Sequence, residues 1–129
     1  MNDKILILIV DDEEELLEMF KECFEMSGFR ALTASSASAG LQIYKNNQEI
    51  QVIISDSEMM GMSGLDFLKN LKEIYTKIPN FYLSTGSVEK SDAAVKLLGG
   101  SGLFLKPFDI DEILFSLFVK DMAFISILY

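Results

Sequence analysis

The feature that most constrains the fold is a continuous apolar run from Ile5 to Val10, which ends abruptly in Asp11 and Asp12. A strand with one solvated face alternates polar and apolar residues, whereas an unbroken apolar run is typical of a strand covered on both faces in a parallel sheet. A second run, Val52 to Ile54, leads within two residues to Asp56. The sequence therefore predicts buried parallel strands whose carboxyl ends carry acids.

Shorter apolar segments alternate with stretches of helical periodicity along the rest of the chain. Strands are expected at residues 4–10, 29–34, 51–56, 81–85 and 103–105. Helices are expected at about 16–27, at 36–45, from 65 to before Pro79, at 88–98, and from Asp109 onward. This order predicts an α/β fold with right-handed crossovers and helices on both faces of a five-stranded sheet.

The helix ends carry signals of their own. Gly28 is expected to end the first helix in a left-handed conformation, and Ser35 or Ser36 to cap the second. Asp12 and Glu15 have the spacing of a capping box. An acidic first turn favours the helix dipole, and this ordinary explanation is accepted for residues 13–15.

Composition excludes several classes of function. The 129 residues suit one domain with one core, and a net charge of −9 argues against binding to nucleic acid. The run from Ile5 to Val10 is too short to span a membrane, and the acids after it are unlike a signal peptide. The absence of histidine excludes imidazole-based triads and zinc sites. A single cysteine, Cys23, suits a reducing cytoplasm.

Polar residues follow four of the predicted strands. They are Asp11 and Asp12 after the first strand, Asp56 and Thr85 at the ends of the third and fourth, and Lys106 after the fifth. Carboxyl ends of parallel strands share one edge of a sheet, and ligands bind at that edge in open α/β sheets. Each residue alone has an ordinary structural explanation, but together they predict one shared site.

The predicted site has a defined chemistry. Two carboxylates about 4 Å apart repel each other by roughly 4 kcal/mol at an effective dielectric constant near 20, which raises the pKa of one of them. A pocket of carboxylate oxygens suits Mg²⁺, and Lys106 would neutralise further charge. A carboxylate can attack phosphorus to form an acyl phosphate. With no histidine to act as a base, hydrolysis of that acyl phosphate should be slow.

At these residues the chain resembles the receiver domains of two-component response regulators. The motifs are Asp11-Asp12, Asp56 with Met59, Met62 and Gly64, Thr85-Gly86, and Lys106-Pro107-Phe108. The resemblance covers essentially the whole chain and implies a single chemotaxis-regulator-like receiver domain over residues 1–129. The implied fold is flavodoxin-like, a doubly wound (βα)5 parallel sheet with the strand order 2-1-3-4-5.

The resemblance also implies roles for individual residues. Asp56 would accept a phosphoryl group from a histidine kinase or a histidine phosphotransfer protein. Mg²⁺ would be bound by Asp12, by Asp11 mainly through water, by Asp56, and by the backbone carbonyl of Glu58. The domain would be a cytoplasmic phosphoacceptor and not a turnover enzyme.

Two further residues would act on the bound phosphoryl group. Thr85 would hydrogen-bond it, Lys106 would contact one of its oxygens, and the Lys106–Pro107 bond is typically cis in such domains. Phosphorylation would then shift a surface made of the fourth helix, fifth strand and fifth helix, which would bind a downstream protein partner.

The sequence departs from the family pattern at several positions. Met60 stands where the family usually has proline, and Leu103 stands at the usual aromatic switch position. Phe104 is expected on the opposite face of the sheet from Leu103. Glu58 and Ser87 occupy positions that tune the rate of dephosphorylation, in a direction that the sequence leaves open.

The last segment is apolar nearly all round, from Ile110 to Ile125. It is expected either to wrap the core of the domain or to form a homodimer or partner face. Two rival functions also stay open at this point. One is a scaffold whose partner binding is independent of phosphorylation, and the other is an aspartate-nucleophile phosphohydrolase.

Overall fold

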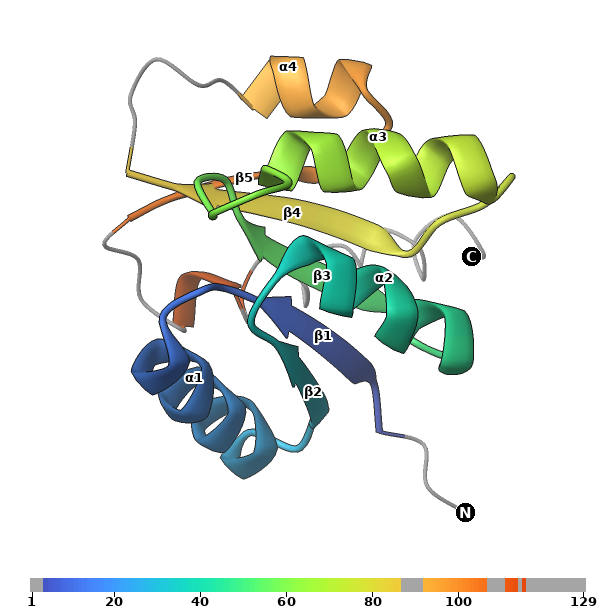
Figure 1. Ribbon diagram of the computed structural model, residues 1–129. Coiled ribbons are helices and arrows are strands. Elements are labelled where there is room, and N and C mark those ends of the chain that lie inside the picture. The colour runs from blue at the N-terminus through green and yellow to red at the C-terminus, as the bar shows by residue number, and fades with distance from the viewer. Residues whose placement is uncertain (1–3, 87–91, 107–110, 114, 116–129) are drawn as a thin grey trace, which may run out of the picture.

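The computed structural model describes residues 4–86, 92–106, 111–113 and 115. Five parallel strands form one sheet in the order β2-β1-β3-β4-β5, which confirms the predicted topology (Figure 1). The strands are β1 (Leu6–Val10), β2 (Arg30–Ala34), β3 (Val52–Asp56), β4 (Asn80–Thr85) and β5 (Gly102–Leu105).

Helices cover both faces of the sheet, as the alternating pattern predicts (Figure 1). They are α1 (Glu14–Met26), α2 (Ala37–Asn46), α3 (Gly64–Ile74) and α4 (Asp92–Leu97). Buried residues of α2, α3 and α4 pack on one face, and those of α1 pack on the other. In the described part of the chain, no helix is long and apolar enough to cross a membrane.

Two cores lie on the two faces of the sheet. The first core consists of Leu6, Leu8, Val10, Ala34, Ala37, Tyr44, Ile50, Ile53, Phe67, Leu68, Leu71, Phe81, Leu83 and Val95. The second core consists of Ile7, Ile9, Leu17, Phe24, Ala31, Val52, Ile54, Tyr82, Phe104 and Ile113. Successive residues of β1 alternate between the two cores because side chains of a strand point alternately to opposite faces. This double burial explains the unbroken apolar run.

The helix ends follow local signals with one exception. Ser36 caps α2, and its hydroxyl accepts a hydrogen bond from the N–H of Ala39 at 3.1 Å. Gly28, with a φ of 96°, follows the carboxyl end of α1 in the predicted left-handed conformation. The Phe29 N–H then donates a hydrogen bond to the Phe24 carbonyl at 3.0 Å. The capping box predicted for Asp12 is wrong, because the N-cap of α1 is Glu13 and no side chain caps it.

Leu103 and Phe104 lie on opposite faces of β5, which confirms the prediction from the one-residue step. Leu103 is partly buried against the first core. Phe104 belongs to the second core and stacks on Tyr82, with ring centroids 5.0 Å apart. The aromatic ring is therefore a core residue of the α1 side and does not replace a switch residue at position 103.

The predicted last helix falls largely outside the described residues, and so does its proposed cap at Asp109. Residues 111–113 are helical, and Ile113 is 1% exposed within the second core. Phe115 is 68% exposed. Ile113 is thus confirmed as a core position, while a homodimer face on this segment stays a prediction.

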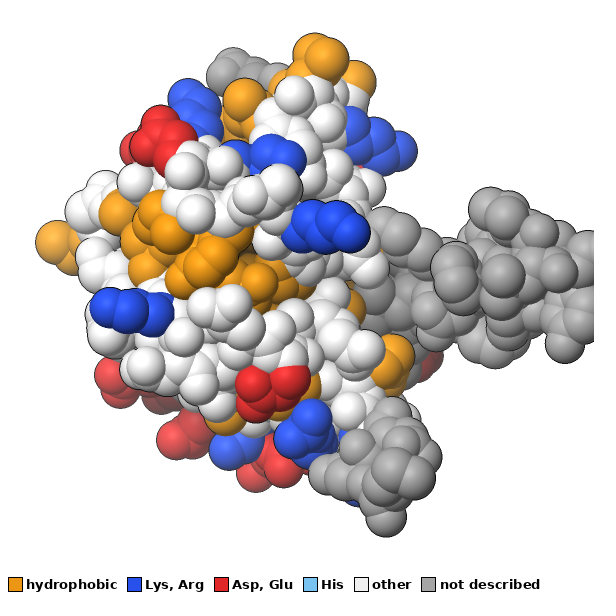
Figure 2. All heavy atoms as spheres, turned by 90° about the vertical axis from the view of Figure 1, so that its right-hand side faces the viewer, with side chains coloured by type: hydrophobic (Ala, Val, Ile, Leu, Met, Phe, Trp, Pro, Cys, Tyr) orange, Lys and Arg blue, Asp and Glu red, His pale blue; other side chains and the backbone are white. Residues whose placement is uncertain are grey.

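Figure 2 shows the face at the amino-terminal ends of the strands, where hydrophobic side chains gather between Lys and Arg side chains. The half-buried apolar residues packed against the first core include Ile43, Tyr75 and Ile78. Tyr75 makes an edge-to-face contact with Tyr44, with ring centroids 4.9 Å apart. Apolar side chains thus lie beside charged ones at this end of the sheet, whereas Asp11, Asp12 and Asp56 lie at the carboxyl end.

Asp92 fixes α4 against the outer edge of β5. Its Oδ1 accepts a hydrogen bond from the Leu103 N–H at 2.9 Å, and its Oδ2 lies 2.8 Å from Lys96 Nζ. A Cβ at Gly102 would lie only 2.8 Å from the same Oδ1, so glycine is needed for this approach. The hydrogen bond from Lys96 holds the pKa of Asp92 below its usual value.

We expect Asp92→Ala to lower the free energy of unfolding by about 1 kcal/mol, because the Leu103 N–H loses its acceptor. Lys96→Ala should cost less, since it removes only an exposed ion pair. Because the pKa of Asp92 is lowered in the folded state, its contribution to the free energy of unfolding is complete above pH 3.8. The contribution is lost as the pH falls through the folded-state pKa. Urea denaturation of both variants from pH 3 to pH 7 measures the two losses of stability. An equal loss in Asp92→Ala and Lys96→Ala at pH 7 would contradict the role of the Leu103 hydrogen bond.

Candidate functional site

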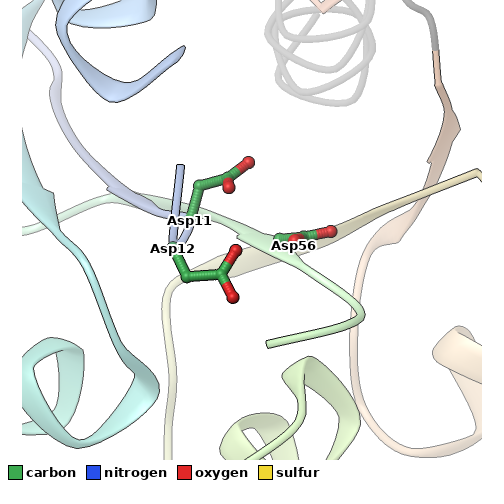
Figure 3. A group of neighbouring side chains, drawn as sticks. All are labelled: Asp11, Asp12 and Asp56. Atoms are coloured by element: carbon green, nitrogen blue, oxygen red, sulfur yellow. The ribbon is translucent and has the colours of Figure 1, made fainter. Parts of the chain in front are cut away.

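The register of β1 and β3 brings the acids together. Val10 lies opposite Ser55, so Asp11 and Asp56 each follow one residue later at the same edge. Figure 3 shows Asp11, Asp12 and Asp56 as neighbours. One carboxylate oxygen of each lies within 4.8 Å of those of the other two. Asp11 and Asp56 are buried, and Asp12 is exposed.

Lys106 reaches the acids from the carboxyl end of β5, which lies two strands away from β3. It directly follows β5, and its N–H donates to the Thr85 carbonyl at 2.6 Å. Its Nζ lies 3.0 Å from Asp56 Oδ1 and 3.5 Å from Asp11 Oδ2. Two buried carboxylates therefore share one ammonium group, which offsets part of their mutual repulsion.

The other sequence-predicted site residues lie around this centre. Thr85 is fully buried at the end of β4 and is the residue after Ser84, which pairs with Asp56. Glu58 is in the loop after β3, with its side chain exposed. Ser87, Pro107 and Phe108 lie outside the described residues, so the expected cis bond and the tuning position at 87 stay predictions.

The loop after Asp56 is tied down at both ends. The Ser57 N–H donates to the Ser84 carbonyl at 2.8 Å, and the Gly64 N–H donates to the Ser57 carbonyl at 3.1 Å. A Cβ at Gly64 would clash with the Asp56 carbonyl oxygen and would lie 2.5 Å from a methyl carbon of Leu83. Gly64 therefore lets the start of α3 pack directly against the chain that carries Asp56.

Burial and charge act against each other at Asp11. Burial raises the pKa of its carboxyl group, the Glu13 N–H and Lys106 lower it, and the charge of Asp56 raises it again, with a net shift upward. The direction agrees with the sequence-based prediction, but the main cause is burial and not carboxylate repulsion. The Glu13 N–H donates to Asp11 Oδ1 at 2.9 Å, so Asp11 takes part of the role expected of Asp12 at the start of α1.

Lys106 is kept charged by the acids. Burial alone would lower the pKa of its ammonium group, but the hydrogen bond to Asp56 and the charges of Asp11 and Asp56 raise it above its usual value. The group is therefore a permanent cation at neutral pH, held against the oxygens of the buried acids.

The donor set fits a hard divalent cation. Three carboxylates with oxygens close together could hold a metal ion, and Mg²⁺ prefers a few carboxylates and several waters. One ammonium group does not balance three carboxylates, so a cation at this edge would be favoured electrostatically.

Comparison with known proteins agrees with this geometry. A family model described as the response regulator receiver domain matches residues 7–117. The chain belongs to this family. A receiver domain is the phosphoacceptor of two-component signalling and accepts its phosphoryl group from a histidine kinase. It is not a turnover enzyme, so the phosphohydrolase alternative falls away.

Individual relatives show how far the similarity extends. The response regulator SaeR of Staphylococcus epidermidis is 29% identical over 107 residues, which cover 83% of this chain and 46% of that protein. The chain thus spans about half the length of the curated relatives that it matches.

Solved receiver structures share the fold. One from Clostridium thermocellum is 32% identical, with a TM-score of 0.76 and coverage of 84% of this chain and 87% of that one. The chemotaxis protein CheY4 of Vibrio cholerae is 27% identical, with a TM-score of 0.78 and coverage of 88% and 96%.

We expect Gly64→Ala to lower the free energy of unfolding by about 2 kcal/mol, since the added methyl group must displace the chain at Asp56. Gly86→Ala is the matched control, because a Cβ there meets nothing within 4 Å. Its effect should stay within about 0.5 kcal/mol. Denaturant titration of both variants measures the difference, and a Gly64→Ala variant as stable as the control would contradict the close approach.

Asp11→Asn should stabilise the metal-free receiver at pH 7. The raised pKa means that wild-type stability falls as the pH rises from 3.8 through the folded-state pKa, because the folded state holds the proton longer. Asparagine removes that charge and keeps an oxygen acceptor for the Glu13 N–H. The gain should vanish below pH 3.8. Chemical denaturation in EDTA across this range is the measurement, and a variant less stable at pH 7 would refute the expectation.

Proposed function

We propose that Asp56 is the phosphoacceptor of this receiver domain. The observation that supports it is the Lys106 Nζ, which lies 3.0 Å from Asp56 Oδ1 while Asp11 and Asp12 supply two further carboxylates. Among the three aspartates, Asp56 is the one at the end of β3, next to the carboxyl end of β4. An incoming phosphoryl group at Asp56 would thus have both an ammonium group and a pair of metal-ligating acids beside it.

The proposed reaction is a transfer of one phosphoryl group. An Asp56 oxygen attacks phosphorus, the bond from phosphorus to the donor's imidazole nitrogen breaks, and that nitrogen keeps the electron pair. Mg²⁺, held by Asp11, Asp12, Asp56 and the Glu58 carbonyl, would shield the two anions from each other.

The surrounding residues then hold the product. Lys106, which lies beside Asp56, would donate a hydrogen bond to one phosphoryl oxygen, and the Thr85 hydroxyl would donate one to another. The chain has no histidine to activate water, so the acyl phosphate should persist long enough to act as a signal.

The partners follow from this role. The donor would be a histidine kinase or a histidine phosphotransfer protein, and the reader of the signal a downstream protein. With a net charge of −9, the chain itself would not bind nucleic acid. One free cysteine suits a cytoplasmic setting, and a membrane is not among the proposed partners. One domain over residues 1–129 and a homodimer through the last helix belong to the same proposal.

A phosphorylation-independent scaffold is the second candidate, favoured by Leu103 at the aromatic switch position. Partner binding that is equal in wild type and Asp56→Asn would support the scaffold over the phosphoacceptor.

Incubation with a small acyl-phosphate donor tests the assignment. We expect the wild-type chain to gain the mass of one phosphoryl group in the presence of Mg²⁺ and not in EDTA, and Asp56→Asn to gain none. Asp66→Asn, which changes an exposed aspartate of α3, serves as the control and should be labelled like wild type. Equal labelling of Asp56→Asn in intact-mass spectra would remove the assignment.

A further inference from the structure

We propose that the backbone N–H of Met60 positions the Asp12 carboxylate for Mg²⁺, an inference that rests on the proposed function. The Met60 nitrogen lies 3.4 Å from Asp12 Oδ2, across 48 residues of sequence. The bond connects the acid pair after β1 with the loop after β3. Because only one oxygen of Asp12 is used, the other stays available to the metal.

Asp12 is the acid that most needs such a bond. Asp11 is held by the Glu13 N–H and by Lys106, and Asp56 is held by Lys106. Asp12 is exposed, and within the part of the chain that the structure describes its carboxylate accepts its hydrogen bond from Met60. Without this donor the side chain would rotate in solvent, and metal binding would have to restrict that rotation.

The Met60 side chain takes no part in this. It is 88% exposed, so its packing contributes little, and the residue acts through its peptide group. Gly61, with a φ of 81°, turns the chain directly after Met60, and the bonds of Ser57 and Gly64 fix the two ends of the loop. The direction of the N–H is thus set by the loop and not by the identity of the side chain.

This makes proline the informative substitution at position 60. Proline has no N–H and could not make the bond to Asp12, whereas any other residue could. Hydrogen bonds to ligating carboxylates typically change metal affinity by 10- to 100-fold. A bond of 3.4 Å at an exposed position should lie at or below the lower end of that range.

The test compares Mg²⁺ dissociation constants of Met60→Pro and Met60→Ala in the full chain, measured by calorimetry. We expect Met60→Pro to bind Mg²⁺ roughly three- to tenfold more weakly than Met60→Ala. Equal or tighter binding by Met60→Pro would overturn this inference alone. Failure of the wild-type chain to bind Mg²⁺ would overturn it together with the proposed function.

A metal-free measurement separates the bond from other effects of proline, which also restricts the residue before it. Hydrogen exchange in EDTA should be several-fold faster at the Met60 amide in Asp12→Ala than in wild type. The Gly64 amide, which donates to the Ser57 carbonyl at 3.1 Å in the same loop, is the internal reference and should not change. An unchanged Met60 exchange rate would show that Asp12 does not hold this amide and would overturn the inference.

Discussion

The contact on which the site depends is the ammonium group of Lys106 placed between Asp56 and Asp11. Parallel strands bring acids to one edge whether or not their charges are compatible, and two carboxylates about 4 Å apart repel by roughly 4 kcal/mol at an effective dielectric constant near 20. The Nζ of Lys106 lies 3.0 Å from an oxygen of Asp56 and 3.5 Å from an oxygen of Asp11, and its positive charge offsets this repulsion. Because three carboxylates face one ammonium group, net negative charge remains, and it favours the binding of a cation at this site.

Backbone N–H groups also hold the acids of the site in place. The Glu13 N–H holds Asp11, and the Met60 N–H holds Asp12. Gly64 lets α3 approach the Asp56 peptide, so that the loop between them stays close to the acids. The receiver site is thus organised by peptide groups of two loops as much as by its charged side chains.

The sequence predicts the sheet well because apolar runs and helical periodicity are local signals, and strand ends in a parallel sheet have a common edge. It predicts the meeting of Asp11, Asp56 and Lys106 for that reason. It does not predict that Asp11, and not Asp12, accepts the N–H at the start of α1, or that Met60 reaches Asp12. Those bonds depend on backbone directions in loops, which no residue type in the chain specifies.

The most direct test of the account is a crystal structure grown with Mg²⁺ and beryllofluoride, a mimic of the phosphoryl group. The account predicts beryllium bonded to an Asp56 oxygen, the metal between Asp11, Asp12 and Asp56, and Lys106 Nζ on a fluoride. Beryllofluoride on another carboxylate, or a metal away from these three acids, would contradict it.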